Sequence, residues 1–327
     1  EIFPKQRDFA IRTFGLPGGA GYLGVCFGRV VTANSPASQG ATPANWQSVL
    51  WHEFCHVVTL TKTNNKMPRW LSEGISTYEE QERNDSWGER LSPQYQVFIA
   101  DGALTPVSQL SSAFLNPKSP MHLQFAYCES SLVVRFLIEK HGIQTLKRVL
   151  TDLGVGMPIN ESLERYVGSI EKLDNDFEAY AKEYAKKVAP EMDWEWKEEW
   201  DELEPAEFVE KLGDHPKNYH LLTRGAAVAI KAKRFDAAEK ALLDLKKLYP
   251  DDRQPNGSLA LLARLYKEKG DEEKELAVLD EFARINDRAL DSYQRLAEDH
   301  HGTSGPSLWR EFRQLSRPEM MSGDHLC

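Results

Sequence analysis

The feature that most limits how this chain can fold is a group of polar residues inside a strongly apolar helical stretch. The stretch covers residues 42–58 and carries His52, Glu53 and His56 in the pattern HExxH. Side chains four residues apart lie on one face of a helix, so both imidazoles can point at one ion while Glu53 reaches its open side. The alternative is a pair of buried, hydrogen-bonded histidines, but that would strand the Glu53 carboxylate in an apolar helix at high cost.

A site of this kind needs a third ligand, and the Glu73 carboxylate is the best candidate. It lies in the segment PRWLSEGI, residues 68–75, which predicts a second helix. Glu73 follows His56 by 17 residues. That separation allows the first helix to end, turn at Asn64 and Asn65, and return antiparallel.

These segments together resemble the gluzincins, and specifically the bacterial peptidase MA-like proteins, which combine an HExxH helix, a PxWLxEG helix and C-terminal tetratricopeptide repeats. The resemblance covers about residues 20–185 and 219–286. The metzincin class is excluded because Thr59 and Lys62 stand where it has a Gly and a third His. We therefore expect an α+β fold: a zincin-like catalytic domain with a small sheet and a mostly helical lower part, followed by an all-α domain of tetratricopeptide-like repeats.

The resemblance implies a zinc metallopeptidase in which His52, His56 and Glu73 hold one Zn²⁺ per chain and Glu53 is the general base. Two neutral imidazoles and one carboxylate leave an open fourth position, as in catalytic zinc sites. A water there has a pKa lowered to about 7, and Glu53 can take its proton as the water attacks a peptide carbonyl. By the same resemblance Tyr127 is the candidate donor to the oxyanion; the alternative is a tyrosine of the core.

Two departures limit how far the resemblance extends to specificity. Ser72 replaces the Asn that precedes the ligand Glu in the related aminopeptidases, and their glycine-anchored exopeptidase motif is absent from residues 18–34. Endopeptidase and exopeptidase action therefore both stay open. Residues 21–32 predict one strand, in which Gly24 and Val25 could pair with an extended peptide substrate. Ordinary sheet structure is the alternative.

Proline, glycine and capping residues set the expected helix boundaries. Thr42 is the expected N-cap of the first helix, with Pro43 at its first position. That helix is apolar almost all round, which predicts burial. Pro68 opens the second helix, and a third spans residues 121–141 and stops at Gly142.

The expected domain organisation has four parts. Residues 1–190 form the zincin-like domain, whose first strands could precede Glu1. Residues 191–210 form an acidic connector helix that contains tryptophans, residues 211–300 form the repeats, and residues 301–327 form a C-terminal helix or tail.

The repeats are predicted from small residues at a regular spacing. Ala226 and Ala263 lie 37 residues apart, near the tetratricopeptide period of about 34, and the polar Asp251–Gly257 loop accounts for the excess. Leu222 and Leu259 stand where the repeat usually has a large aromatic. Tetratricopeptide repeats would bind a protein partner, whereas ordinary helical hairpins would have no binding groove.

The negative charge is concentrated in the connector. Residues 191–210 carry ten acidic side chains and one lysine, a charge of −9 out of a net −10. The rest of the chain is nearly neutral and has no basic patch, which argues against nucleic acid as a partner. No run approaches the roughly 18 apolar residues of a membrane span. We expect a soluble protein, with no signal or membrane segment in this chain, whose compartment the sequence does not indicate.

A second class of function stays open. The chain could be a non-catalytic, zinc-binding scaffold in which a degenerate peptidase fold accompanies partner-binding repeats. The intact Glu53 disfavours this interpretation, because a structural zinc site has no use for a general base.

Overall fold

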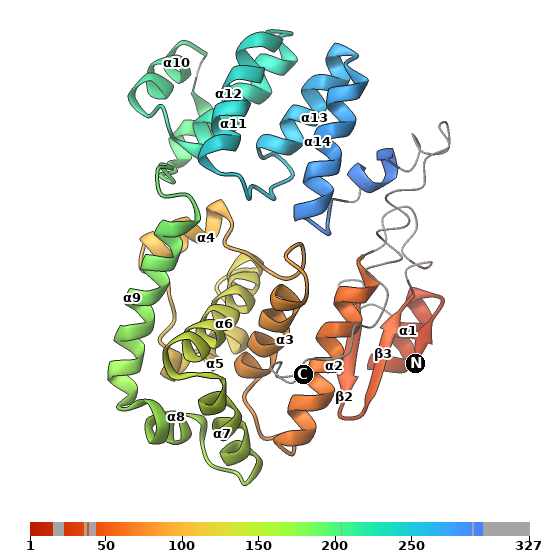
Figure 1. Ribbon diagram of the computed structural model, residues 1–327, viewed down its shortest axis with the longest axis vertical. Helices are drawn as coiled ribbons and strands as arrows, with labels where there is room; N and C mark the ends of the chain where they lie inside the picture. Colours follow the sequence, from red (N-terminus) through yellow and green to blue (C-terminus); the bar gives the residue numbers. More distant parts are fainter. Residues whose placement is uncertain (16–22, 36–37, 39–43, 204, 290, 297–327) are drawn as a thin grey trace. The chain divides into compact units, whose positions relative to one another are not determined.

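The computed structural model describes residues 1–15, 23–35, 38, 44–203, 205–289 and 291–296. These residues form two compact units (Figure 1). Unit 1 contains Glu1–Arg90 and Leu104–Ala181, and unit 2 contains Leu91–Ala103 and the described residues from Lys182 onward. The predicted C-terminal helix or tail, residues 301–327, lies outside the described residues.

Unit 1 contains a small three-stranded sheet. Its strands are β1 (Ile2–Phe3), β2 (Gly24–Phe27) and β3 (Val30–Asn34), in the order β1-β3-β2, with β1 parallel and β2 antiparallel to β3. The prediction of one strand over residues 21–32 was wrong, because the chain reverses at Gly28 and Arg29. Gly28 has a φ of 64°, which a glycine adopts without strain, and Phe27 pairs with Val30 across this two-residue loop. β2 is therefore an edge strand.

Helix α2 (Trp46–Lys62) carries the HExxH motif and begins later than predicted. Its N-cap is Asn45, whose side chain accepts hydrogen bonds from the backbone N–H groups of Gln47 at 3.1 Å and Ser48 at 3.3 Å. The expected cap at Thr42 and Pro43 lies outside the described residues. The expectation of burial on all sides was also wrong: two large side chains of α2, Trp46 and Phe54, are 47% and 41% exposed.

The second and third predicted helices are present as α3 (Arg69–Arg83) and α6 (Pro120–His141). Asn64 and Asn65, both with positive φ, lie in the turn between α2 and α3. Helix α3 packs against both α2 and α6 (Figure 1). Helices α1 (Gln6–Phe14), α5 (Ser111–Leu115), α7 (Ile143–Gly154), α8 (Ile159–Val167) and most of α9 (Ile170–Val188) complete unit 1.

Unit 2 is helical in its described residues. Its elements are α4 (Pro93–Ala100), α10 (Pro205–Asp214), α11 (Tyr219–Lys231), α12 (Phe235–Leu248), α13 (Ser258–Lys269) and α14 (Glu272–Ile285). Helices α11 and α12 pack as one pair, and α13 and α14 as another. The two regularly spaced alanines, Ala226 and Ala263, are both buried in the core of these helices. The helical pairs agree with the expected hairpins, while the tetratricopeptide assignment stays a prediction.

The connector is not the continuous helix expected over residues 191–210. The backbone of Asp193 bridges to the segment before α11: its N–H donates to Lys217 O at 3.0 Å, and its C=O accepts from Tyr219 N–H at 2.9 Å. A short 3₁₀ helix, Glu198–Glu202, follows, and α10 starts at Pro205. A continuous helix cannot include Asp193, because its backbone N–H and C=O are bonded to the segment before α11. It also cannot continue through Pro205, because proline has no N–H to donate.

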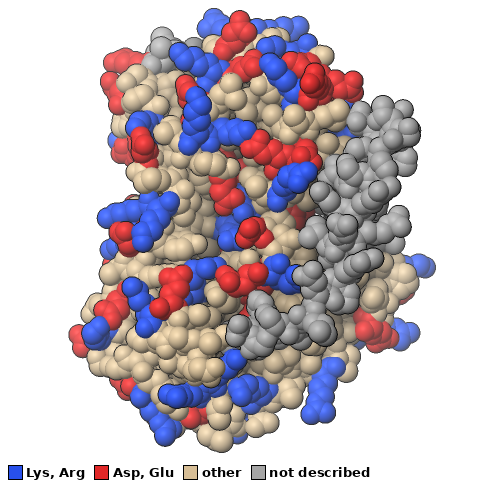
Figure 2. All heavy atoms as spheres, in the orientation of Figure 1, with Lys and Arg blue, Asp and Glu red and all other residues tan. Residues whose placement is uncertain are grey.

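Two surface properties bear on function. In the face shown in Figure 2, acidic and basic side chains of the described residues are interspersed. Among the described residues, no helix combines the length and apolar character needed to cross a membrane.

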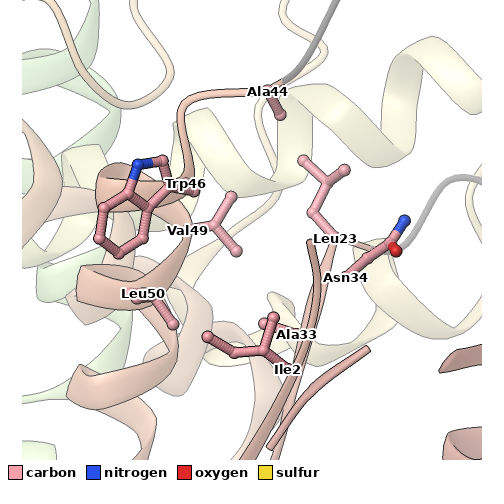
Figure 3. A pocket seen from close by; sticks show the side chains of 8 residues that line it. All are labelled: Ile2, Leu23, Ala33, Asn34, Ala44, Trp46, Val49 and Leu50. Carbon is pink, nitrogen blue, oxygen red and sulfur yellow. The ribbon is translucent and has the colours of Figure 1, made fainter. Parts of the chain in front are cut away.

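An apolar pocket opens in unit 1 between the sheet and the first half of α2 (Figure 3). It is small, with a volume of about 20 Å³. Its lining residues are Ile2, Leu23, Ala33, Asn34, Ala44, Trp46, Val49 and Leu50.

The crossing of α3 and α6 depends on Gly74. A Cβ at this position would lie 2.6 Å from the carbonyl oxygen and 2.8 Å from the carbonyl carbon of Ser130, a clash with backbone. The two helices can therefore approach this closely only because residue 74 has no side chain.

We predict that Gly74→Ala destabilises unit 1 by roughly 1–3 kcal/mol, because the added methyl group pushes the two helices apart. Urea unfolding measures the effect. The control is Gly213→Ala in α10, where an added Cβ meets nothing within 4 Å; it should be neutral or slightly stabilising. Equal stabilities of the Gly74→Ala variant and the wild type would contradict the close crossing.

Candidate metal centre

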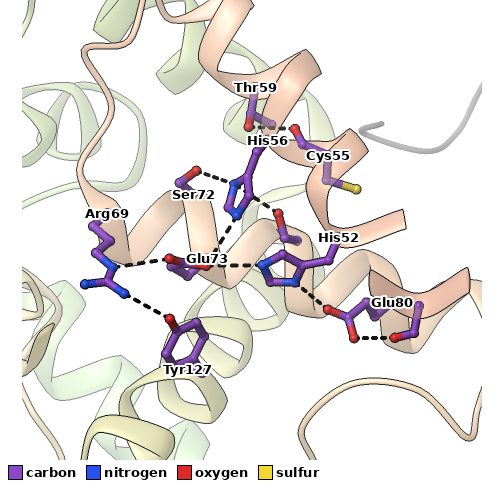
Figure 4. A network of polar contacts seen from close by, with 11 residues as sticks. His52, Cys55, His56, Thr59, Arg69, Ser72, Glu73, Glu80 and Tyr127 are labelled. Carbon is purple, nitrogen blue, oxygen red and sulfur yellow. Dashed lines mark hydrogen bonds and ion pairs between the residues drawn. The ribbon is translucent and has the colours of Figure 1, made fainter. Parts of the chain in front are cut away.

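Helices α2 and α3 bring His52, His56 and Glu73 together in unit 1 (Figure 4). Oε2 of Glu73 lies 3.2 Å from Nε2 of His52 and 3.4 Å from Nε2 of His56. Each of the three residues offers one ligand atom, and these atoms all lie within 4.8 Å of one another.

The spacing of these atoms fits a zinc ion. Bonds of about 2.0–2.1 Å in a tetrahedral arrangement place neighbouring ligand atoms about 3.3 Å apart. The two separations from Glu73 Oε2, 3.2 and 3.4 Å, agree with this value. Two imidazole nitrogens and one carboxylate oxygen are also a donor set that zinc prefers.

The ring nitrogen of His52 that faces away from the centre is held by Glu80. Nδ1 of His52 lies 2.5 Å from Oε1 of Glu80, and the Ser48 hydroxyl donates to Oε2 of Glu80 at 2.9 Å. An imidazole whose Nδ1 carries the proton presents Nε2 as the ligand. Glu80 was not predicted from the sequence, although it follows Glu73 by seven residues, or two helical turns, and so lies on the same face of the helix.

His56 is oriented by two serines of α3. Its Nδ1 lies 2.8 Å from Oγ of Ser72 and 3.3 Å from Oγ of Ser76. Ser72 is the residue that departs from the aminopeptidase pattern, and here its hydroxyl contacts an imidazole of the centre. Both histidines thus have partners that direct Nε2 toward Glu73.

The ionisation of Glu73 and His52 reflects their mutual contact. Burial alone would raise the pKa of Glu73, but hydrogen bonds and charge from His52 and His56 outweigh it and lower that pKa. Burial alone would lower the pKa of His52, but the charges and hydrogen bonds of Glu80 and Glu73 raise it well above its usual value. The centre therefore favours a negative carboxylate facing positive charge.

Glu53 lies against the edge strand. It is 7% exposed, and a Cβ added at Gly24 of β2 would lie 2.8 Å from its Cγ and 3.0 Å from its Oε1. Only a glycine leaves room for the carboxyl here. Burial raises the pKa of Glu53 more than the charges of His52 and His56 lower it, which suits a group that takes and releases a proton.

The register of the hairpin shows that the backbone groups of Gly24 and Val25 face opposite sides of β2. Val25 pairs with Thr32, and the neighbouring bond from Asn34 N–H to Leu23 O, at 2.8 Å, shows that odd-numbered residues of β2 bond to β3. In an antiparallel pair the intervening residues turn their backbone groups outward. The backbone of Gly24 therefore faces the open edge, whereas that of Val25 faces β3.

Tyr127 of α6 belongs to the same network as the three candidate ligands. Its hydroxyl accepts a hydrogen bond from Nη2 of Arg69 at 3.0 Å, and Nε of Arg69 donates to Oε1 of Glu73 at 3.2 Å (Figure 4). Arg69, which precedes Glu73 by one helical turn, was not predicted from the sequence. The structure thus links every predicted catalytic and metal-binding residue except Glu53 through hydrogen bonds, and Glu53 lies on the helix turn between His52 and His56.

A second group of side chains in unit 2 has metal-ligand chemistry. Asp193, Glu195 and His215 each place one candidate ligand atom within 4.8 Å of the others. Their contacts are already internal: His215 Nδ1 lies 3.0 Å from Asp193 Oδ2, and Lys197 Nζ lies 3.0 Å from Glu195 Oε1. These ion pairs account for the cluster without a bound ion.

Comparison with known proteins found one similarity to a protein family. The model of the Peptidase MA superfamily matches residues 27–183, a range that includes α2, α3 and α6. No curated protein and no solved structure matches the chain. Residues 27–183 are therefore similar to this superfamily, whose members are generally zinc-dependent. The match does not extend over the helical pairs α11 to α14.

We predict that Glu80→Gln lowers the affinity for zinc by about 10- to 100-fold, because it removes the charge that supports His52 as a ligand. Competition with a chromophoric chelator measures this affinity. Glu82→Gln removes the same charge from the same helix outside the network and serves as the control. Equal affinities of the two variants would contradict the role of Glu80.

A second prediction concerns Glu129, two residues beyond Tyr127. Its side chain is 1% exposed, and its Oε1 accepts a hydrogen bond from Thr105 N–H at 2.5 Å. Burial raises the pKa of Glu129 to about 8, although that hydrogen bond lowers it. A carboxyl with a raised folded-state pKa adds stability below its unfolded pKa, and this stability is lost as the pH rises to 8.

Glu129→Gln should therefore become progressively more stable than the wild type between pH 5 and pH 8, reaching on the order of 4 kcal/mol. Urea unfolding of the metal-free protein at several pH values measures the difference. The exposed Glu161, replaced by Gln, is the control and should follow the wild type. A Glu129→Gln curve parallel to the wild type would show that the carboxyl ionises normally.

Proposed function

We propose that this protein is a zinc-dependent metallopeptidase that hydrolyses peptide bonds. The observation that carries the proposal is the convergence of three candidate ligand atoms, with Glu73 Oε2 lying 3.2 Å from His52 Nε2 and 3.4 Å from His56 Nε2. The similarity to the Peptidase MA superfamily supports it. His52, His56 and Glu73 would hold the ion, which when bound acts as a Lewis acid that lowers the pKa of water and polarises a carbonyl oxygen.

Glu53 is the proposed general base. Its carboxylate accepts a proton from the attacking water as the water oxygen bonds to the peptide carbonyl carbon, and then gives that proton to the amide nitrogen as the C–N bond breaks. Contact with Gly24 limits the carboxyl to one side of the strand.

The proposed substrate position follows the edge of the sheet. An extended peptide can add to an edge strand through main-chain hydrogen bonds, and the outward backbone groups of β2 belong to residues such as Gly24. The apolar pocket lies next to Gly24, because Val49 lines the pocket and would also lie 3.1 Å from a Cβ added at Gly24. We propose that a small apolar side chain of the peptide packs against the residues that line this pocket.

Tyr127 is the proposed donor to the oxygen that becomes negative during attack. A donor of this kind contributes about 2.7–4 kcal/mol to transition-state stabilisation in other hydrolases. Its link to Glu73 through Arg69 supports a place in the same site.

The test combines metal analysis with digestion of a peptide library. We expect about one zinc per chain and cleavage that a chelator abolishes. Glu53→Gln should retain zinc and lose at least about 100-fold in rate, because only the proton transfer is removed. Glu82→Gln is the control and should keep both zinc and activity.

The outcomes separate the peptidase from the scaffold. Full zinc occupancy without cleavage across a broad library would favour a non-catalytic scaffold whose partner binds the helical pairs of unit 2. A chain that binds no zinc would contradict both functions.

A further inference from the structure

We propose that Arg69 is a positioning residue that selects which oxygen of Glu73 faces the metal centre and fixes the orientation of the Tyr127 hydroxyl. The inference deepens the proposed function and rests on it for the catalytic consequence. Its structural part is that Arg69 positions the Glu73 carboxylate and the Tyr127 hydroxyl. This part does not depend on whether the protein hydrolyses peptides.

The first contact separates the two oxygens of Glu73. Nε of Arg69 donates to Oε1 at 3.2 Å, whereas Oε2 lies 3.2 Å and 3.4 Å from the Nε2 atoms of His52 and His56. One oxygen is thus held by the guanidinium and the other faces both imidazoles. Arg69 thereby fixes the rotation of the carboxylate, so that Glu73 presents a single oxygen.

The second contact sets the direction of the Tyr127 hydroxyl. Arginine has five N–H donors and no acceptor, so the Tyr127 oxygen must accept the 3.0 Å bond from Nη2. The hydroxyl hydrogen therefore points away from Arg69. In this orientation the phenol can donate to an oxygen that gains negative charge, and the nearby guanidinium adds favourable electrostatics.

Aromatic contacts hold the guanidinium in place. The guanidinium carbon of Arg69 lies 5.2 Å from the ring centre of Phe114 on α5, and the ring of Phe114 lies 5.2 Å from that of Tyr127. Phe114 is itself buried. The guanidinium is therefore fixed by contacts from α3, α5 and α6, although the Arg69 side chain is 51% exposed.

The location of Arg69 argues against an ordinary surface ion pair. It is the first residue of α3, where the helix dipole disfavours a cation. An exposed i, i+4 pair contributes only about 0.3–0.5 kcal/mol. Two bonds from different nitrogens of one planar group are a geometry that lysine cannot reproduce.

The experiment uses the full chain and compares Arg69→Gln, Arg69→Lys, Tyr127→Phe and the Arg69→Gln/Tyr127→Phe double variant. Arg83→Ala, which removes an arginine from the other end of α3, is the control. Three quantities are measured: zinc affinity by chelator competition, the ¹⁹F NMR signal of Tyr127 in fluorotyrosine-labelled protein, and kcat and KM on a cleaved peptide. The Tyr127 signal is assigned from its loss in Tyr127→Phe.

We expect Arg69→Gln to weaken zinc binding severalfold, to shift the Tyr127 signal and to lower kcat about 10- to 100-fold with little change in KM. Tyr127→Phe should lower kcat but leave zinc affinity unchanged. The double variant should be no slower than the slower single variant, because Arg69 acts through Tyr127. Arg69→Lys should recover part of the zinc affinity but not the Tyr127 signal.

The proposal is overturned if Arg69→Gln leaves both the zinc affinity and the Tyr127 signal at their wild-type values, or if the two losses in kcat multiply. If the wild type cleaves no peptide, the proposed function fails, but zinc affinity and the Tyr127 signal still decide whether Arg69 positions both groups.

Discussion

The packing of α3 between α2 and α6 is the contact on which the rest of the site depends. One face of α3 directs Ser72, Glu73, Ser76 and Glu80 toward the histidines of α2. Its opposite side meets α6 at Gly74, where the backbones approach so closely that a methyl group does not fit. Gly74 on the side of α3 that meets α6 thus allows the opposite side of α3 to present polar residues to α2.

A buried polar face is costly unless each group is paired. Ser72, Ser76 and Glu80 are buried, and each contacts an imidazole nitrogen. The outer nitrogens of the histidines satisfy these side chains, while the inner nitrogens converge on Glu73. The same contacts therefore reduce the cost of burial and fix the direction of the candidate ligands. Because each ring is held from behind, its rotation cannot vary without breaking a buried hydrogen bond.

The sequence predicted the local features of this site better than the features that arise from packing. Helical spacing and Pro68 were sufficient to place His52, Glu53, His56 and Glu73 on two helices that meet. The supporting contacts of Arg69 and Glu80 depend on how α3 packs against its neighbours, which spacing within one helix does not determine. Tyr127 was reached only through a family resemblance.

The errors in the predicted fold have similar causes. The β-branched run through Gly28 has the composition of one strand, and only the positive φ of that glycine reveals the hairpin. The connector has helical spacing of its tryptophans, but the strand-like bridge of Asp193 to the chain before α11 prevails over it. In both segments a backbone contact outweighed side-chain periodicity.

The assignment of Leu91–Ala103 to unit 2 means that the chain passes from one unit to the other and back before it leaves unit 1 for good. Helix α4 is held within unit 2 by a bond from the Tyr249 hydroxyl to Leu91 O at 3.2 Å and by one from Gln96 to Ala185 O at 3.2 Å. A single cut near residue 190 would therefore divide unit 2 and remove Tyr249, which bonds to Leu91. Unit 2 is therefore not one contiguous piece of polypeptide, and a gene fragment that ends at the connector would encode α4 without the Tyr249 that bonds to Leu91.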